Sequence, residues 1–194
     1  MVIGHSSLIR YDWENHFPLA PFPAKESIIG KLINAPVRPG EVAWIGIRPA
    51  RKAPVTSLPA VEAVAGRGLA GDHYKGNPAS NRHVTLIQAE HLAAVAAFLG
   101  RADLDPGLVR RNILVRGLNL LALKDQRFYV GDTLLEMTGA CHPCSQMEDI
   151  LGEGGYNAMR GHGGITARIV RGGTIRVGDP VSVAPPENAP GDER

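Results

Sequence analysis

The sequence predicts a mainly β fold with flanking helices, an α+β class, in which the sheet is curled or closed on itself. Glycine and proline, 23 and 15 of the 194 residues, divide the chain into short elements. Most of these elements are rich in β-branched residues and end at glycine, and only one long segment has helical apolar spacing. Many short strands with glycine corners and few helices are typical of a bent or closed sheet.

The predicted strands share β-branched or aromatic residues and a glycine or proline stop. They cover residues 41–49, 59–65, 83–87, 127–132, 133–138, 166–171 and 174–179, and a turn of helix runs into a further strand within 108–115. The best helix is 88–99, because it is rich in alanine, its apolar residues recur at helical spacing, and Gly100 follows as a C-terminal cap. A second, short helix is compatible with residues 24–32.

One domain is expected. Residues 1–39 read as an N-terminal extension, 40–184 as the folded domain, and 185–194 as a disordered tail, since the last stretch is polar and rich in proline. A chain of this length can bury a core without disulfides or metals.

Composition excludes several classes of protein. The chain is 44% apolar and 21% charged, close to the globular average, and its net charge of +2 is too small to attract nucleic acid or a membrane surface. Its longest nearly apolar stretch, residues 92–99, falls far short of the roughly 20 residues that span a bilayer. The first ten residues do not have the pattern of a signal peptide. We therefore expect a cytoplasmic protein without nucleic-acid or membrane partners.

The sharpest chemical signal is Cys141-His142-Pro143-Cys144. Two cysteines are too few for a disulfide framework, and a bridge across so short a loop would stabilise little, so reduced thiols are expected. The pair fits a thioredoxin-like motif, although that motif should open a helix in a βαβ unit. It also fits half of a zinc site, completed by a histidine such as His73, His83 or His162. It further fits a single reactive or ligating thiolate, or two buried small side chains.

Two glycine-rich segments and several arginines offer hydrogen-bond donors for an anion. Gly71 and Asp72 lie in the glycine-rich run 68–73, which fits either a backbone anion cradle or a tight turn. The guanidinium group of arginine matches the geometry of phosphate and carboxylate. The candidate anion-binding arginines are Arg82, Arg110, Arg111, Arg160 and Arg168, and Asn112 directly follows Arg111. For any one arginine, a solvated surface position is the alternative. The loop 160–168 fits an anion-binding loop that enters a strand, and it fits a plain glycine-rich connection equally well.

Taken in order, these segments resemble the MOSC domain, the module named from the C-terminal part of molybdenum-cofactor sulfurases. The resemblance covers most of the chain and is carried by Gly68-Leu69-Ala70-Gly71-Asp72-His73, Arg111-Asn112-Ile113 with Gly117, Val130-Gly131-Asp132, Gly139-Ala140-Cys141-His142-Pro143-Cys144, Gly172-Gly173-Thr174-Ile175 and Val177-Gly178-Asp179-Pro180-Val181. It implies a strongly bent, barrel-like mixed β-sheet with flanking helices.

The resemblance also implies a function. In relatives such as the mitochondrial amidoxime-reducing component, the cysteine that corresponds to Cys144 ligates the molybdenum of a pterin cofactor, and basic side chains bind the cofactor phosphate. In cofactor sulfurases the domain is thought to carry or deliver sulfur. We therefore expect a stand-alone MOSC protein in which Cys144 is the metal ligand or sulfur carrier. His142 and Asp72 are candidate catalytic acids, and Gly71, Asn112 and the arginines are candidate cofactor-binding residues.

The expected reaction, if the protein is an enzyme, is reduction of N-hydroxylated compounds by a molybdenum-pterin cofactor, with electrons from a redox partner protein. A non-catalytic sulfur or cofactor carrier that docks with a sulfurtransferase, and a zinc-stabilised binding module, are the alternatives. The amidoxime-reducing relatives carry a further N-terminal β-barrel domain that this sequence lacks. Pyridoxal phosphate is tied to this family through the separate domain of the sulfurases, and because no lysine stands in a Schiff-base motif, we expect none bound here.

Overall fold

The computed structural model describes residues 24, 26–74 and 76–185, and the chain divides into two compact units, Met1–Pro36 and Val37–Arg194. In the first unit the described helix is α1 (Ile28–Ile33), which begins where the Ser27 hydroxyl accepts a 2.9 Å hydrogen bond from the amide of Gly30. This helix confirms the short helix predicted within residues 24–32. Most of the predicted extension and nearly all of the predicted tail lie outside the described residues.

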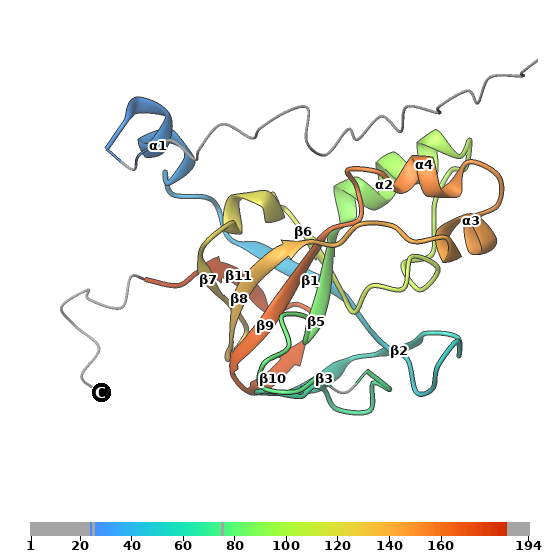
Figure 1. Ribbon diagram of the computed structural model, residues 1–194, viewed down its shortest axis with the longest axis horizontal. Helices are drawn as coiled ribbons and strands as arrows, with labels where there is room; N and C mark the ends of the chain where they lie inside the picture. Colours follow the sequence, from blue (N-terminus) through green and yellow to red (C-terminus); the bar gives the residue numbers. More distant parts are fainter. Residues whose placement is uncertain (1–23, 25, 75, 186–194) are drawn as a thin grey trace, which may run out of the picture. The chain divides into compact units, whose positions relative to one another are not determined.

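The second unit contains the strands and the remaining described helices (Figure 1). Its strands are β1 (Gly40–Ile47), β2 (Thr56–Leu58), β3 (Ala60–Val64), β4 (Gly68–Leu69), β5 (Val84–Gln88), β6 (Ile113–Arg116), β7 (Arg127–Val130), β8 (Thr133–Ala140), β9 (Ile165–Arg171), β10 (Gly173–Arg176) and β11 (Pro180–Val183). Its helices are α2 (Ala89–Phe98), α3 (Gln146–Leu151), α4 (Gly155–Met159) and the 3₁₀ turn η1 (Leu120–Leu123).

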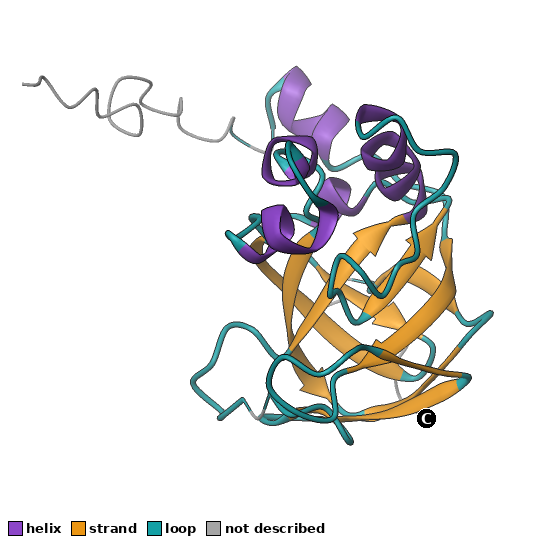
Figure 2. Cartoon of the chain, turned by 90° about the vertical axis from the view of Figure 1, so that its right-hand side faces the viewer, coloured by secondary structure: helices purple, strands orange, loops and turns teal. Residues whose placement is uncertain are grey.

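A closed mixed barrel forms the body of this unit (Figure 2). The strand order is β11-β7-β8-β9-β5-β6-β1, and β1 pairs back onto β11 through Gly40 and Val181, which closes the ring. Strand β2 extends the sheet from β1, outside the ring. The β5–β6 pair is parallel, and every other pairing is antiparallel. The predicted bent, barrel-like sheet is confirmed.

A second sheet, with the order β10-β3-β4, covers part of the barrel core. Val61 of β3 and Ile175 of β10 belong to the same buried cluster as Phe128 and Leu86 of the barrel strands. Each such fully buried side chain stabilises the fold by about 2 kcal/mol through the hydrophobic effect. One continuous core therefore joins the two sheets.

Helices α2, α3 and α4 gather at one side of the strands (Figure 1). Val95 of α2, Met147 of α3 and Met159 of α4 are buried in one apolar cluster with Ile87 and Leu114 of the parallel strands. Strand β5 is consequently buried at every position, as expected for a strand covered on both faces. Within the part of the chain that is described, no helix has both the length and the apolarity to cross a membrane.

The sequence prediction of α2 is confirmed, but α3 and α4 were not predicted. The sequence predicts no helix next to Cys144, and this is wrong, because α3 begins two residues later, at Gln146. Both helices are short, and Gly154 and Gly155 interrupt their spacing, so no apolar period is long enough to identify them. The flanking strands β8 and β9 are antiparallel, which excludes the βαβ unit of a thioredoxin-like site here.

Candidate functional site

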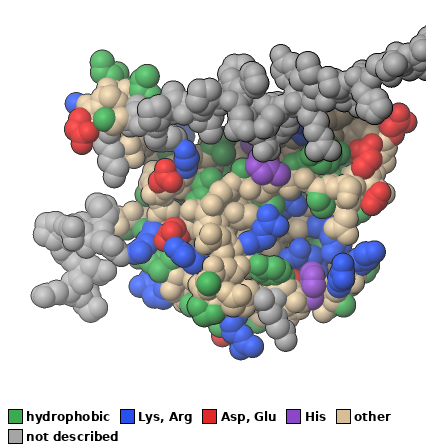
Figure 3. Space-filling view, viewed as in Figure 1, with side chains coloured by type: hydrophobic (Ala, Val, Ile, Leu, Met, Phe, Trp, Pro, Cys, Tyr) green, Lys and Arg blue, Asp and Glu red, His purple; other side chains and the backbone are tan. Residues whose placement is uncertain are grey.

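A cavity of about 190 Å³ opens where β5, β6 and the loop after β8 approach one another. Residues from widely separated segments form its wall: Arg48, Tyr74, Arg82, His83, Val84, Thr85, Arg110, Arg111, Asn112, Cys141, His142, Cys144, Gln146 and Met147. Four of these residues carry guanidinium groups, and none of them carries a carboxylate. Figure 3 shows several Lys and Arg side chains on the face of the molecule that is turned toward the viewer. The charge of Arg48 is paired with Asp72, and the charges of Arg82, Arg110 and Arg111 leave the cavity electropositive, which favours an anionic ligand.

The two cysteines of the pocket differ in exposure. Cys141 is buried, and its backbone amide donates a 2.8 Å hydrogen bond to the carbonyl of Gly164. Cys144 is exposed and lies in the loop that leads into α3. Because a thiol must be accessible to act as a nucleophile or a ligand, Cys144 is the one that can react.

Arg111 lies beneath the cavity and is only 8% exposed. Its guanidinium donates hydrogen bonds to the carbonyls of Gly163, Val109 and Cys141, at 2.7, 3.0 and 3.2 Å. No carboxylate of the described residues forms an ion pair with it. Burial is the main cause that lowers its pKa, and negative charge on Cys141 and Cys144 raises it. An arginine stays protonated despite such a shift, so this buried positive charge lacks a fixed counter-ion.

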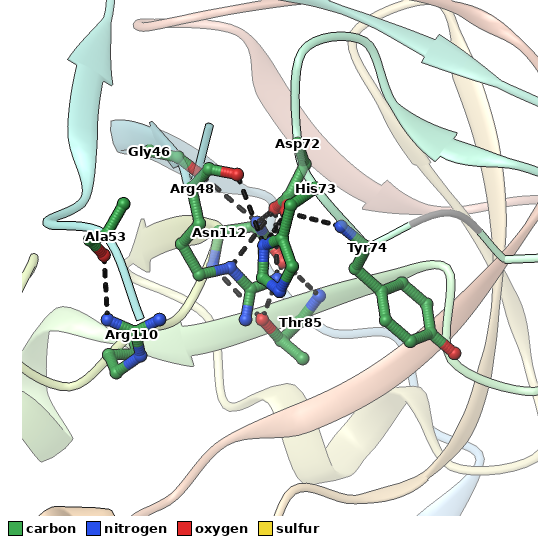
Figure 4. Close-up of polar contacts among 9 residues, drawn as sticks. All are labelled: Gly46, Arg48, Ala53, Asp72, His73, Tyr74, Thr85, Arg110 and Asn112. Carbon is green, nitrogen blue, oxygen red and sulfur yellow. Dashed lines mark hydrogen bonds and ion pairs between the residues drawn. The ribbon is translucent and has the colours of Figure 1, made fainter. Parts of the chain in front are cut away.

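Arg110 adopts a left-handed backbone, with φ of +55°. Its guanidinium is half-buried and donates a 3.0 Å hydrogen bond to the carbonyl of Ala53 (Figure 4). Burial and the nearby charge of Arg48 lower its pKa, whereas the negative charges of Asp72 and Cys144 raise it. A residue other than glycine in this region costs about 1–2 kcal/mol and is found most often at functional sites.

Asp72 is the centre of a buried polar network beside the pocket (Figure 4). Its carboxylate accepts hydrogen bonds from Nε and a terminal nitrogen of Arg48, at 3.3 and 3.0 Å, and from the amide of Asn112 at 2.7 Å. The backbone amide of Tyr74 donates a further bond of 3.0 Å. Asp72 does not line the cavity, so its contribution is to hold Arg48 against the wall.

Asn112 uses all of its polar atoms inside the protein. Its side-chain oxygen accepts bonds from the amide and hydroxyl of Thr85, and its amide nitrogen donates to Asp72 and to the carbonyl of Gly46. A direct contact between Asn112 and a cofactor therefore stays a prediction, and the bonds present give this side chain a positioning role.

The histidines near the pocket have different environments. His142 is exposed on the rim. His83 is buried, and its Nδ1 accepts a hydrogen bond from the amide of Ile169. Its Nε2 must then carry the proton, which it donates to the carbonyl of Asn77 at 3.0 Å. His83 thus has no free lone pair for a metal. Among residues 24, 26–74 and 76–185, no three histidine, cysteine or acidic side chains cluster as metal ligands, so the alternative of a zinc site has no support there.

Other predicted site residues lie apart from the cavity. Arg168 forms an ion pair of 2.8 Å with Glu136 across strands β9 and β8. Arg160 is exposed at the end of α4 and does not line the cavity, nor does Gly71 in its turn at φ of +81°. The structure therefore brings together Cys144, His142, Arg82, Arg110, Arg111 and Asn112, and leaves Arg160, Arg168 and Gly71 outside.

The glycine-rich loop before β9 contacts protein rather than open space. A side chain at Gly163 would place its Cβ 2.0 Å from the carbonyl of Cys141, and one at Gly164 would place it 1.9 Å from the carbonyl of Leu86. These glycines let the loop pack against the cysteine segment and present the Gly163 carbonyl to Arg111. The interpretation of this loop as a connection is favoured over an anion cradle.

Sequence reasoning missed Arg48, which lies directly after β1. It also missed Tyr74, Gln146 and Met147 as lining residues. For Arg48 a signal was available, because a charged residue at the end of an apolar strand and before Pro49 is placed at the rim of the sheet.

Comparison with known families agrees with this arrangement. The model of the MOSC domain matches residues 70–182, more than half of the chain. The chain belongs to the MOSC domain family. The match includes Asp72, the buried arginine Arg111, and both cysteines. Among curated proteins, none matches the sequence.

Solved structures show the same MOSC fold. The YuaD protein of Bacillus subtilis has a TM-score of 0.65 at 18% identity, over 75% of this chain and 96% of that one. YiiM of Geobacillus stearothermophilus has a TM-score of 0.62 at 17% identity, over 75% of each chain. YiiM of Escherichia coli has a TM-score of 0.58 at 16% identity, over 75% of this chain and 70% of that one. At these identities the likeness concerns the fold alone.

Proposed function

We propose that this MOSC protein holds a molybdenum-pterin cofactor, or carries a sulfane sulfur, on the thiolate of Cys144. The observation that carries the proposal is the convergence of one exposed thiol and four guanidinium groups on a cavity. Among the described residues, only Arg48 of these four is paired with a carboxylate, that of Asp72. A thiolate is a soft ligand that suits a transition metal or a sulfur atom, and guanidinium groups bind phosphate.

The donor set fits the cofactor in its chemistry. Cys144 would hold the metal, and Arg82 and Arg110, with the spare N–H groups of Arg111, would hold the anionic phosphate. The buried charge of Arg111, which has no carboxylate partner among the described residues, favours an anion in this position. The cavity of about 190 Å³ is smaller than the roughly 300–1,000 Å³ of pockets that enclose drug-sized ligands. It therefore accommodates the thiol-bound and anionic parts of a ligand better than an entire pterin cofactor.

The protein's own residues would act as follows. Asp72 and Asn112 fix Arg48, and the Gly163 carbonyl fixes Arg111, so the cationic wall is in place before a ligand arrives. When bound, the cofactor supplies two-electron redox chemistry at its metal, for which N-hydroxylated compounds are the proposed substrates. His142 on the rim is the residue best exposed to exchange a proton with solvent and substrate. Asp72, buried under four donors, is proposed as a positioning residue.

Elemental analysis tests the cofactor arm of the proposal. Protein from a molybdenum-replete host should contain molybdenum and release a fluorescent oxidised pterin, and Cys144→Ser should lose most of both. Cys141→Ser, a change of the same atoms at the buried cysteine, is the control and should retain them. A Cys144→Ser protein with full metal content and full reductase activity would remove this arm.

The sulfur-carrier arm predicts a different product. After incubation with a cysteine desulfurase and cysteine, the intact protein should gain the mass of one sulfur atom on Cys144. The gain should disappear on treatment with a thiol reductant and should be absent from Cys144→Ser. A desulfurase reaction that leaves the mass unchanged, in protein whose Cys144 is reduced and accessible to alkylation, would contradict this arm.

A further inference from the structure

The shape and charge of the cavity indicate a substrate class for Cys144. Its volume of about 190 Å³ is below the range of pockets that enclose drug-sized ligands, so it can surround a small ligand and only part of a large one. Its wall combines four guanidinium groups with a thiol and contains no carboxylate. A small, highly charged anion that reacts with a thiolate meets both conditions.

The positive charges lie close enough to the thiol to act on both reactants. Arg82, Arg110 and Arg111 line the same cavity as Cys144. Burial is the main cause that lowers the pKa of Arg110 and of Arg111, and negative charge on Cys144 opposes it. Arg111 has five N–H donors, of which three are bound to backbone carbonyls. The same groups can therefore neutralise a thiolate and an anionic sulfur donor that approaches it, which would otherwise repel each other.

Resting on the sulfur-carrier arm of the proposed function, we propose that Cys144 accepts its sulfur from a thiosulfonate oxyanion, with inorganic thiosulfate as the simplest member of the class. The Cys144 thiolate attacks the outer sulfur of the donor. A new bond forms between Sγ and that sulfur, the sulfur–sulfur bond of the donor breaks, and its electron pair leaves on sulfite.

The step balances without a further reactant. Cys144 becomes a persulfide anion, the sulfonyl sulfur is reduced to sulfite, and the total charge is unchanged, so neither a proton nor an external oxidant is needed. Arg82 and Arg110 stabilise the departing sulfite oxygens, because charge builds up on them as the bond breaks. A neutral sulfur donor would gain nothing from these guanidinium groups.

The test measures two reactions of the full chain side by side. Reduced protein is incubated with thiosulfate, and both released sulfite and the mass of one added sulfur atom on the protein are measured. The same protein is alkylated with iodoacetamide, a neutral reagent that reports only the accessibility and nucleophilicity of the thiol. The quantity compared between variants is the ratio of the thiosulfate rate to the iodoacetamide rate.

We expect one sulfite and one persulfide for each Cys144, and neither product from Cys144→Ser. Arg82→Gln and Arg110→Gln should each lower the rate ratio by about tenfold, the loss expected for one charge-assisted hydrogen bond. The matched control is Arg176→Gln, which removes the same charge from an exposed residue of β10 outside the cavity and should leave the ratio unchanged.

Three outcomes would overturn the inference in distinguishable ways. Rapid alkylation of Cys144 without release of sulfite would exclude the thiosulfonate donor and leave the proposed function intact. Slow alkylation together with no sulfite would show that Cys144 is not a nucleophilic thiol, and would remove both this inference and the sulfur-carrier arm on which it rests. A rate ratio that Arg176→Gln lowers as much as Arg110→Gln would show that net charge, and not the cavity, attracts the donor.

Discussion

The side-chain amide of Asn112 donates a 2.7 Å hydrogen bond to the carboxylate of Asp72, a residue 40 positions earlier in the chain. Both side chains are buried, with 3% and 6% of their surface exposed. The bond joins the segment that enters β6 to the turn after β4, and Asp72 in turn holds Arg48. One amide therefore connects the core of the barrel to the cationic wall of the pocket.

Replacing Asn112 by alanine should destabilise the protein by about 3 kcal/mol, because it leaves several buried polar groups without a partner. Among them is the carbonyl of Gly46, which accepts a hydrogen bond from the same amide. The measurement is urea unfolding followed by circular dichroism. Asn119→Ala is the matched control, since Asn119 is exposed and caps only the turn η1, and it should cost about 1 kcal/mol.

A second variant distinguishes the loss of the Asn112 hydrogen bonds from the loss of side-chain volume. Asn112→Asp keeps the size of the side chain but replaces the donor with an oxygen that faces the Asp72 carboxylate, so the two should repel. This protein should be no more stable than Asn112→Ala. A protein as stable as the wild type would show that the network does not hold the fold.

Arg110→Gly should weaken the binding of an anion in the cavity while leaving the stability of the protein nearly unchanged. Glycine adopts the φ of +55° freely, which relieves about 1 kcal/mol of strain and offsets the greater entropy of the unfolded glycine chain. We expect a change in stability of less than about 1 kcal/mol and a marked loss of the thermal stabilisation given by inorganic sulfate, used as a probe anion.

The control for this variant is Lys52→Gly, another left-handed position, at φ of +64°. Lys52 is exposed and does not line the cavity, so its removal should leave the effect of sulfate on the melting temperature unchanged. Equal loss of the sulfate effect in both variants would place the anion outside the pocket.

Much of the barrel could be predicted from local sequence, because most of its strands carry their own β-branched residues and several end at a glycine. The short strand β2 (Thr56–Leu58) has no such local pattern and was not predicted. The chemistry was predictable only where the residues are close in sequence. Cys141 and Cys144 stand out as a pair, but which of them is exposed depends on the pairing of Cys141 with Gly164, a contact that no local pattern contains.

The errors in the candidate site have the same cause. Arg168 was chosen by residue type, yet its strand position directs it to Glu136 on β8. Arg48 lies at a strand end that local sequence marks, but its position against the cavity wall depends on Asp72, 24 positions further along the chain, and on Asn112, which holds Asp72. Side chains brought together by long-range pairing of strands cannot be selected before the register of those strands is known.

Gly164→Ala should be among the most destabilising substitutions in the loop before β9. Its Cβ would lie 1.9 Å from the carbonyl oxygen of Leu86, and its φ of +81° disfavours any side chain. Because backbone atoms must move to relieve the contact, we expect a loss of about 3–5 kcal/mol in the free energy of unfolding. Arg111 should also lose its fixed position, since the neighbouring Gly163 carbonyl holds its Nε.

Gly161→Ala is the control in the same loop. Gly161 has a similar φ of +78°, but no atom lies within 4 Å of the point that an added Cβ would occupy. The free energy of unfolding should therefore fall only by the about 1–2 kcal/mol that a left-handed backbone costs a residue other than glycine. Comparable losses in the two variants would mean that the loop does not pack against β5 as closely as the structure indicates.

The His91–His162 pair should make stability depend on pH. The two rings meet edge to face with centroids 4.8 Å apart, and Nδ1 of each is buried without a hydrogen-bond partner among the described residues. Burial is the main cause that lowers the pKa of His91 from its ordinary 6.5, and the charge of His162 lowers it further, against the opposing effect of Glu90.

As the pH falls through 6.5, the unfolded chain therefore binds a proton at His91 before the folded protein does. Stability must then decrease with decreasing pH, until the folded protein also binds that proton. His91→Phe keeps an aromatic ring against His162, which also contacts Phe98, but the new side chain cannot titrate. This variant should therefore lose less stability than the wild type between pH 7.5 and pH 5.5, measured by urea unfolding. His142→Gln, at an exposed position, should behave as the wild type does. If His91→Phe and the wild type lose equal stability over that range, another group is responsible for the acid sensitivity.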